Sequence, residues 1–486
     1  MLQKIRSITA ESGRSVQAAL MDHYTLLLML VTAAGLFLRL YGLGNASISM
    51  DEAVDIFLAG LSVSDIWAYI ANGFIFHPPL FYWIQHVVLL FGTGEFIVRL
   101  PSALYGALTI PVVYLLGKEF HSRDVGILAA GLLAVSPFHI FYSQDARPYT
   151  MMLLFCALAL VYFMEAMKTD RGDAWVMFGI ISGLSVWIVF YAAVLTFSLL
   201  LFVVIDRRRR ILKGFDENRA LYVGGIFYLI VIMPLAGMIR NLFMLREGSD
   251  VTWGLKGLDV VTESFRDFYA HNDLLMAVSI LLLIIGIAGL YRYDRRKCAL
   301  LVTMIFTPLA VSVLISYKLA IEPRYALIIL PALVVGIAMT CAVADGLLKL
   351  EKIHSRLVVL VLFLVVITAL SIPPVQDLYT STAKFNQDWR NMSVTVSALT
   401  GPGDVVVILP DYMARPFNYY YSAGREGTAE FAVTTTTQLE DAYRLKGSHR
   451  MVVVEDADHQ APPMQWVLAH SDLCLSEGEV SVYCIR

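Results

Sequence analysis

Long apolar windows are the feature that most restricts how this chain can fold. Windows of about 17–25 apolar residues mark helices that cross a lipid bilayer. The composition, 58% hydrophobic and 16% charged, agrees with a polytopic α-helical membrane protein and not with a soluble domain. Eleven spans are predicted, at 24–43, 98–116, 125–142, 149–167, 175–190, 191–205, 221–239, 274–290, 298–316, 326–343 and 357–373.

The apolar stretch 175–205 decides the number of spans. It is too long for one ordinary span, and we interpret it as two short helices that meet near Phe190-Tyr191. A single tilted helix is the alternative. The choice matters because it changes the side of the membrane on which every later loop lies.

Loop charge predicts the orientation. With eleven spans, one set of loops holds 20 Lys and Arg and the other set holds seven. Because basic loops remain in the cytoplasm, segment 1–23 is predicted to be cytoplasmic. Residues 24–373 are predicted to form the membrane domain, and its first outer loop, 44–97, is predicted to face the extracytoplasmic side. The tail 374–486 is also extracytoplasmic. The basic loops are 1–23, 117–124, 168–174, 206–220, 291–297 and 344–356.

The tail 374–486 changes character and predicts a small extracytoplasmic α/β domain. Its turn signals are Gly401-Pro402-Gly403 and Gly424. One helix is expected at Thr437–Leu445. Short strands are expected at Val405–Leu409, Met451–Val454, Leu473–Leu475 and Val480–Ile485.

Two cysteines in this tail are spaced for a disulfide. Cys474 and Cys484 are equidistant from Glu479, so a hairpin centred there would place them opposite each other. An extracytoplasmic location is oxidising and favours the bond. The alternative is two ordinary buried thiols in a differently paired hairpin. The other three cysteines, Cys156, Cys298 and Cys341, lie in apolar spans and are interpreted as small core residues.

The first outer loop carries two adjacent acids, Asp51 and Glu52. Acids at membrane depth are costly and are by default candidates for a functional site. The sequence between Gly42 and Val98 contains no Lys or Arg, so no cation within this loop can neutralise them. The alternative is that the acids only cap a short helix that begins after Ser47 or Ser49.

Three further clusters fall on the predicted outer side. The first is His77-Pro78-Pro79-Leu80-Phe81-Tyr82, in which two prolines stop a helix in front of Tyr82. The second holds Asp145 and Arg147, which are candidates for the site or for a simple ion pair with each other. The third holds Lys318, Arg324 and Tyr325. Basic residues there run against the charge bias of the loops, so we interpret them as binding an anion such as phosphate; a lipid headgroup contact is the alternative.

Together these clusters resemble the GT-C glycosyltransferases that use polyprenyl-phosphate sugars. The most similar branch contains the protein O-mannosyltransferases and the lipid A aminoarabinose transferase. The matching motifs occur in order over residues 24–205, whereas Arg324-Tyr325 and the tail match more weakly. The motifs are Met50-Asp51-Glu52-Ala53, His77-Pro78-Pro79-Leu80, the segment from Arg99 to Gly106, Ser136-Pro137-Phe138-His139 and the segment from Tyr142 to Tyr149.

The resemblance implies that a sugar passes from a lipid phosphate to a glycolipid, glycan or protein acceptor at the outer face of the cytoplasmic membrane. Asp51 would act as general base for the acceptor. Arg324, Arg147 or Lys318 would stabilise the phosphate leaving group. A single displacement inverts the anomeric centre; retention would need a second nucleophile, for which Glu52 or Asp145 is available. The long apolar spans would hold the polyprenyl chain.

The sequence leaves the metal and two other function classes open. Some members of the family carry a divalent metal, but no convincing ligand set is visible here. The small net charge, −3, gives no indication of a nucleic-acid partner. A transporter or flippase for lipid-linked sugars would show repeated halves or paired broken helices, and neither is evident. A non-catalytic lipid-binding subunit would tolerate Asp51→Asn, which an enzyme with this base should not.

Overall fold

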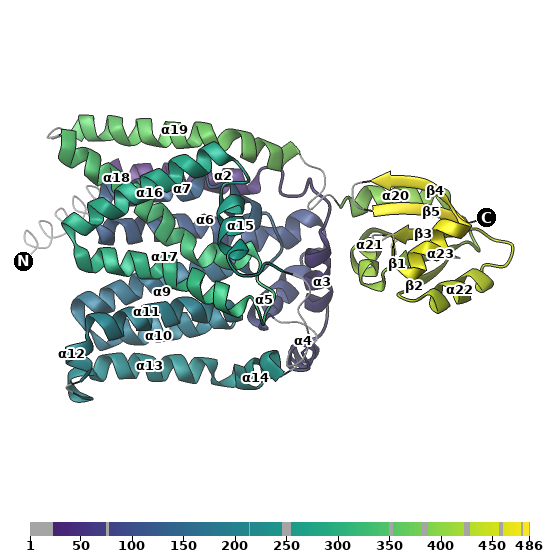
Figure 1. Ribbon diagram of the computed structural model, residues 1–486, viewed down its shortest axis with the longest axis horizontal. Coiled ribbons are helices and arrows are strands. Elements are labelled where there is room, and N and C mark those ends of the chain that lie inside the picture. Colours follow the sequence, from purple (N-terminus) through teal and green to yellow (C-terminus); the bar gives the residue numbers. More distant parts are fainter. Residues whose placement is uncertain are drawn as a thin grey trace, which may run out of the picture. The chain divides into compact units, whose positions relative to one another are not determined.

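The computed structural model describes residues 23–73, 77–212, 214–244, 254–348, 353–380, 387–421, 428–455, 460–477 and 480–485 (Figure 1). The chain divides into two compact units. The first, here called the helical unit, comprises Met1–Tyr41, Val63–Trp83 and Leu100–Leu378. The second, here called the C-terminal unit, comprises Gly42–Ser62, Ile84–Arg99 and Tyr379–Arg486. Two pieces of the first outer loop therefore belong with the tail.

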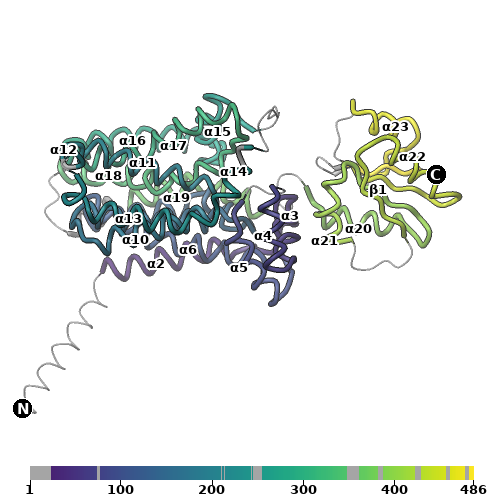
Figure 2. Tube along the Cα trace, turned by 90° about the horizontal axis from the view of Figure 1, so that it is seen from below, coloured from purple at the N-terminus to yellow at the C-terminus, as the bar shows by residue number. Residues whose placement is uncertain are grey.

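Helices account for almost all regular structure before residue 381. The long ones run side by side as a bundle in both Figure 1 and Figure 2, and neighbours such as α16 and α18 contact each other along their length. The helices are α2 (His23–Leu40), α3 (Met50–Ala59), α4 (Val63–Ala71), α5 (Leu80–Leu89), α6 (Glu95–Phe120), α7 (Arg123–Ala134), α8 (Pro137–Ser143), α9 (Tyr149–Thr169), α10 (Gly172–Val186), η1 (Phe190–Ala192), α11 (Ala193–Asp206), α12 (Arg208–Ile211), η2 (Asp216–Asn218), α13 (Arg219–Ile232), η3 (Met233–Leu235), α14 (Ala236–Met244), α15 (Asp259–Phe268), α16 (Asp273–Tyr293), α17 (Arg295–Ile315), η4 (Pro323–Ile329), α18 (Leu330–Leu348) and α19 (Ile353–Thr380).

The predicted polytopic helical fold is confirmed. In the described part of the chain, eight helices are long and apolar enough to cross a membrane, and the pair α7 and α8, bent by 60°, is a candidate ninth. Helices α10 and α11 are shorter and apolar, and they occupy the stretch 175–205. They are separated at residues 187–189, followed by the short helix η1, so the predicted break near Phe190-Tyr191 is present. A helical segment lies at each of the eleven predicted windows.

A buried arginine stabilises the bend between α7 and α8. The guanidinium of Arg39, in α2, donates to the carbonyl oxygens of Leu133 and Ala134, both at 3.1 Å, where α7 ends. It also lies 2.5 Å from Nδ1 of His139 in α8. Carbonyl groups at the end of an interrupted helix need a donor when they are buried. We therefore assign Arg39 a structural role at this bend.

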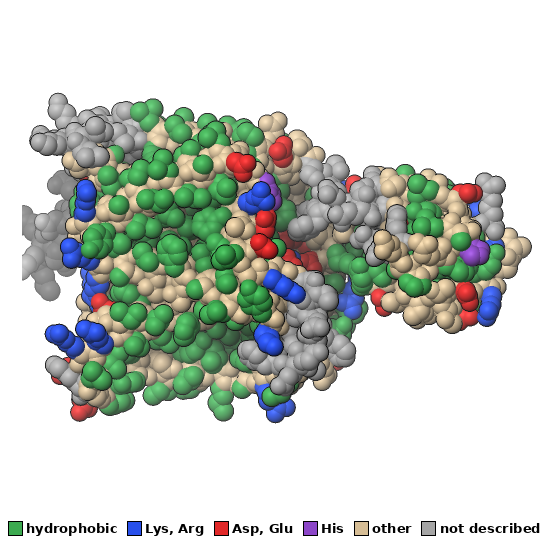
Figure 3. Space-filling view, in the orientation of Figure 1, with side chains coloured by type: hydrophobic (Ala, Val, Ile, Leu, Met, Phe, Trp, Pro, Cys, Tyr) green, Lys and Arg blue, Asp and Glu red, His purple; other side chains and the backbone are tan. Residues whose placement is uncertain are grey.

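Four of the loops that were grouped by their charge lie at the same end of the helical unit: 117–124, 168–174, the described part of 206–220, and 291–297. Their side chains form ion pairs across the bundle, and Figure 3 shows a row of Lys and Arg side chains at that end. The Lys297 ammonium also donates to the Glu119 carbonyl oxygen at 2.5 Å. The ion pairs are Lys168–Glu119 at 2.9 Å, Arg207–Asp170 at 2.7 Å and Arg296–Asp206 at 2.7 Å.

The side of the membrane that this basic end faces is a prediction with a direct test. A reporter that is active only outside the cytoplasm should be active when fused after Arg486 and silent when fused within 207–213. The reverse result would mean that 175–205 crosses the membrane once or that another span is miscounted.

The C-terminal unit contains one five-stranded mixed sheet in the order β2-β1-β3-β5-β4. The first three strands are parallel, and β5 and β4 join them antiparallel. The expected α/β domain is present, although β2 and three of its four α-helices were not predicted. The elements are α20 (Trp389–Leu399), β1 (Val405–Leu409), η5 (Asp411–Met413), α21 (Ala414–Tyr421), β2 (Ala429–Ala432), α22 (Thr436–Leu445), β3 (Met451–Glu455), α23 (Pro462–His470), β4 (Asp472–Glu477) and β5 (Val480–Ile485).

Alternating side chains of the central strands build one core on each face of this sheet. In β1, Val406 and Ile408 pack with α20 and α21, whereas Val405, Val407 and Leu409 pack with α22 and α23. This alternation follows from the period of two residues along a strand. All five residues are buried, as expected for a central parallel strand covered on both faces.

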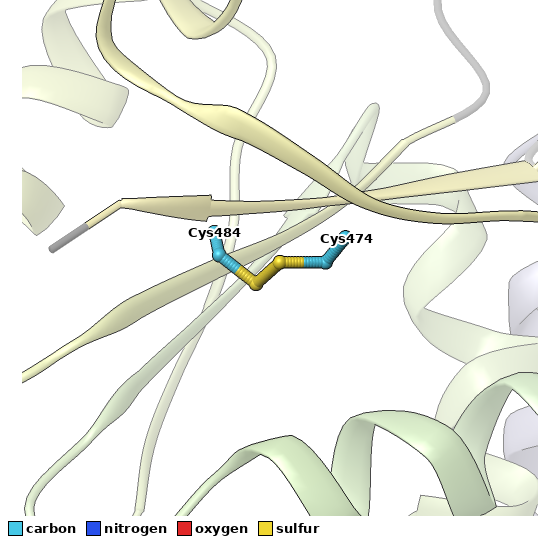
Figure 4. Close-up of a disulfide and its surroundings, with 2 residues drawn as sticks. All are labelled: Cys474 and Cys484. Atoms are coloured by element: carbon cyan, nitrogen blue, oxygen red, sulfur yellow. A yellow bond between two sulfur atoms is a disulfide. The ribbon is translucent and has the colours of Figure 1, made fainter.

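The disulfide between Cys474 and Cys484 is present, with the Cα atoms 5.9 Å apart (Figure 4). The predicted register is wrong. Ser476 pairs with Ser481, so the hairpin is not centred on Glu479, which lies outside the described residues together with Gly478. An irregularity between residues 473 and 475 of β4 leaves Cys474 as the extra residue of a bulge. The bulge shifts the pairing by one residue and brings the two cysteines within bonding distance.

Thiol labelling of unreduced, denatured protein tests the bridge. We expect three reactive cysteines, at Cys156, Cys298 and Cys341. Five would contradict the disulfide. The part of the C-terminal unit that follows residue 386 is here called the C-terminal domain. Since the bridge closes a short loop, its loss should lower the free energy of unfolding of this domain by only about 2–3 kcal/mol.

Candidate functional site

The acidic pair of the first outer loop begins helix α3. The Ser49 hydroxyl accepts a hydrogen bond from the Glu52 N–H at 3.3 Å, and the Glu52 carboxylate accepts one from the Ser49 N–H at 2.9 Å. This reciprocal capping box stabilises a helix start, so the capping interpretation is correct for Glu52. Asp51 is half-buried in the same first turn, and Asp55 is buried one turn later.

Glu52 also forms a buried ion pair. Its carboxylate accepts hydrogen bonds from the Arg99 guanidinium at 2.7 and 2.8 Å, and both side chains are at most 1% exposed. The cation that loop 42–98 lacks is therefore supplied by the next residue. A paired, buried carboxylate that also caps a helix has a structural role, which leaves Asp51 as the better placed candidate for chemistry.

A second cluster, in the helical unit, joins His77 to the segment between α8 and α9. The Arg147 guanidinium lies 3.4 Å from Nε2 of His77 and donates to the Tyr149 hydroxyl at 3.2 Å. That hydroxyl is itself 3.4 Å from Nε2 of His77. Pro78 and Pro79, which follow His77, directly precede helix α5, and Pro148 directly precedes α9. These prolines restrict the backbone next to His77 and next to Arg147.

The third predicted cluster reaches the same place from helix η4. Arg324 lies over the Tyr149 ring at 5.6 Å, and its guanidinium is 3.6 Å from the Glu322 carboxylate. The Tyr325 ring lies 6.5 Å from His77 and 6.2 Å from Tyr149. Residues more than 240 positions apart in sequence are thus brought into one cluster of two arginines, a histidine and two tyrosines.

An apolar cavity of about 320 Å³ adjoins this cluster. His77 and Tyr325 form part of its wall, together with Tyr191, whose ring is 5.5 Å from that of Tyr325. Apart from these three residues, the wall is hydrophobic. The remaining residues are Val186, Val189, Phe190, Ala193, Val194, Ile239, Val311, Ile315, Leu319, Ala320 and Ile321. The break between α10 and α11 supplies one side of this cavity.

The other predicted site residues occupy different environments. Asp145 is 2% exposed, and its backbone carbonyl oxygen accepts from the Arg147 N–H at 2.7 Å. Tyr82 is completely buried, with its ring 5.7 Å from that of Phe81, as is typical of a core aromatic residue. Lys318 is exposed just after α17.

Sequence reasoning gave no individual role to three neighbours of this cluster. Tyr149 was named only as the last residue of the motif that begins at Tyr142, and Tyr191 only as part of the predicted helix break at Phe190-Tyr191. The third, Asp267 of α15, has a carboxyl whose pKa is raised by burial and by Glu263, against the opposing effect of His271, 3.0 Å away.

Metal ligands were left unknown by the sequence. Within the described ranges, no group of three or more His, Cys, Asp or Glu side chains is arranged to hold a metal ion.

Comparisons with known proteins agree with this architecture. Residues 76–237 match the family model described as dolichyl-phosphate-mannose-protein mannosyltransferase. A search of curated proteins finds no significant match.

Solved structures match over most of the chain. Two are of ArnT from Cupriavidus metallidurans. The apo form has a TM-score of 0.62 and 14% identity, over 95% of this chain and 97% of that one. The form bound to undecaprenyl phosphate has a TM-score of 0.60 and 13% identity, over 96% of this chain and 98% of that one.

The oligosaccharyltransferase AglB from Archaeoglobus fulgidus, in complex with an inhibitory peptide and a dolichol-phosphate, has a TM-score of 0.53 and 12% identity, over 88% of this chain and 69% of that one. The chain therefore has an ArnT-like fold, and its residues 76–237 are similar to the dolichyl-phosphate-mannose-protein mannosyltransferase family.

Proposed function

We propose that the protein is a membrane glycosyltransferase that moves a sugar from a polyprenyl-phosphate donor to a glycolipid, polysaccharide or protein acceptor. The proposed location is the outer face of the cytoplasmic membrane. The observation that carries this proposal is the position of Arg147 and Arg324 beside an apolar cavity. A polyprenyl phosphate needs both parts, cations for its head and a hydrophobic wall for its chain.

The donor phosphate is assigned to the arginines. Planar guanidinium groups donate paired hydrogen bonds that match phosphate geometry, and Arg324 and Arg147 both lie against the Tyr149 ring, at 5.6 and 5.5 Å. His77 and Tyr325 belong both to this cluster and to the cavity wall, so they are assigned to the junction of phosphate and prenyl chain. The structures of ArnT with undecaprenyl phosphate and of AglB with a dolichol-phosphate support a polyprenyl phosphate as the ligand of this fold.

Asp51 is assigned as general base. Its carboxylate takes the proton of the acceptor hydroxyl while the hydroxyl oxygen forms a bond to the anomeric carbon. The bond from that carbon to the phosphate oxygen breaks, and its electron pair leaves with the polyprenyl phosphate. Positive charge near the leaving oxygen lowers the barrier for this step. One displacement of this kind inverts the anomeric centre.

Incubation of purified protein with a panel of labelled prenyl-phosphate sugars tests the function. The measurement is the loss of sugar from the lipid. Because water or a mixed membrane extract supplies the acceptor, a donor can be identified before the acceptor is known. We expect turnover of at least one donor, and we expect Asp51→Asn to reduce that turnover strongly. Binding of donors with no turnover in the presence of extract would favour a lipid-binding subunit. Movement of intact donor across a vesicle membrane would favour a flippase.

A further inference from the structure

The irregular segment in front of α3 is held by two arginines of the C-terminal unit. Arg99 donates to the carbonyl oxygens of residues 43, 46 and 47 at 3.1, 2.8 and 2.9 Å. Arg390, in the first turn of α20, donates to those of residues 44, 45 and 46 at 3.3, 3.1 and 3.5 Å. Every carbonyl from residue 43 to residue 47 therefore accepts from a guanidinium group. Arg99 directly follows the first outer loop, in α6, whereas Arg390 belongs to the C-terminal domain.

The contact made by Arg390 continues into an ion pair and a tyrosine. Its guanidinium lies 2.5 Å from the carboxylate of Glu95. The Tyr420 hydroxyl donates to the same carboxylate oxygen at 2.9 Å and accepts from the Ile48 N–H at 2.8 Å. Burial raises the pKa of Tyr420 to about 12, so the hydroxyl keeps the proton that it donates. Ile48 is completely buried, only three positions before Asp51.

Helix α3 itself packs on the C-terminal domain. Met50, its first residue, packs against the core cluster that contains Trp389 and Phe417. The Arg415 guanidinium lies 4.2 Å from the centre of the Phe57 ring, further along α3. Asp51 follows Met50 directly, so the backbone on its N-terminal side is fixed by the C-terminal domain as well as by its own loop.

We propose that Arg390 is a positioning residue, and that the C-terminal domain sets the place of Asp51 through Arg390, Glu95 and Tyr420. This inference rests on the proposed function, in which Asp51 is the base. Displacement of a reacting group by about 1 Å can cost on the order of 10² in rate. Loss of Arg390 should therefore lower kcat, whereas binding of undecaprenyl phosphate, assigned to the helical unit, should be retained.

Arg390→Met removes the guanidinium donors and keeps most of the aliphatic stem. In the full-length protein in lipid nanodiscs, we expect faster hydrogen exchange at amides 46–53 and a fall in kcat of about 10- to 100-fold, with the KM for the donor found by the panel unchanged. Arg390→Lys should restore kcat partly, because an ammonium keeps the charge opposite Glu95 but not the planar fork. The matched control is Arg444→Met in α22, whose side chain is 75% exposed and pairs with Asp441 one turn earlier in the same helix; it should change neither measurement.

A double variant separates positioning from general stability. If Arg390 acts through Asp51, adding Arg390→Met to Asp51→Asn should cause little further loss of turnover, because interacting groups are not additive. An equal loss in both backgrounds, unchanged exchange at 46–53, or wild-type kcat in Arg390→Met would overturn the proposal. If Arg390→Met does not fold, Tyr420→Phe, which lacks one hydroxyl, should give the same pattern more weakly. Full turnover in Asp51→Asn alone would instead refute the proposed base.

Discussion

Asp51→Asn should lower sugar transfer by about 10²–10⁴-fold while the donor lipid still binds. The substitution keeps the size of the side chain and much of its hydrogen bonding, and it removes only the basicity. Its neighbour Glu52 cannot readily replace it, because that carboxylate is completely buried against Arg99 and caps α3. The measurement is the rate of sugar loss from labelled donor, together with equilibrium binding of undecaprenyl phosphate.

Asp65→Asn is the matched control for this prediction. Asp65 also lies in the first turn of a short helix of the same loop, α4, and it is exposed. It should turn over donor at the wild-type rate. Wild-type turnover in Asp51→Asn would remove Asp51 from the mechanism, and a loss of folded protein would be visible as a loss of lipid binding as well.

The membrane architecture could be predicted because it depends on local properties of the chain. Span length and apolar content are set by the thickness of the bilayer, and each predicted window contains a helical segment. Even the break inside 175–205 followed from length. The bend between α7 and α8 did not, since it depends on Arg39, whose partners lie almost 100 residues away.

Ion pairing over long sequence distances was not predictable. The partner of Glu52 is Arg99, 47 residues away and one position beyond the stretch without Lys or Arg that ends at Val98. Arg390 and Glu95 are almost 300 residues apart and meet only because two pieces of the first loop fold with the tail. Charge patterns along a chain indicate which residues need partners, but tertiary folding decides which partners they find.

Strand register was also beyond the sequence. The two cysteines correctly indicated a disulfide, but the symmetric hairpin assumed for it has no bulge, whereas β4 has one between residues 473 and 475. One extra residue changes every pairing beyond it. Strand β2 was missed because it is a short edge strand, Ala429–Ala432, with mostly exposed side chains and therefore a weak hydrophobic pattern.

The arginine cluster was the most informative part of the predicted site. Basic residues on the less basic side of the membrane were interpreted as binding an anion, and Arg147 and Arg324 lie against the same tyrosine ring. Their roles in binding donor stay predictions. Tyr149, the last residue of the motif that begins at Tyr142, and Tyr191, at the predicted helix break, received no individual role because an aromatic residue in a span usually only packs or lies at an interface.

Arg324→Ala is expected to weaken binding of the donor lipid by several-fold or more. The side chain of Arg324 is 14% exposed, so a phosphate that it binds is partly shielded from water, and losing a charge-assisted contact there is costly. Arg324→Lys should restore affinity only partly, since an ammonium cannot donate two parallel hydrogen bonds. The measurement is the dissociation constant for undecaprenyl phosphate, compared with that for uncharged undecaprenol.

The comparison with undecaprenol separates the phosphate contact from the contact with the prenyl chain. Arg324→Ala should reduce the preference for the phosphate and leave undecaprenol binding unchanged, because the cavity wall lies on other residues. Arg266→Ala is the matched control: this α15 arginine is 55% exposed and pairs with Glu263 within its own helix. If both Arg324 variants bind and turn over donor normally, the phosphate site lies elsewhere. Arg147, 6% exposed and 3.4 Å from His77, is then the next residue to test, ahead of the exposed Lys318.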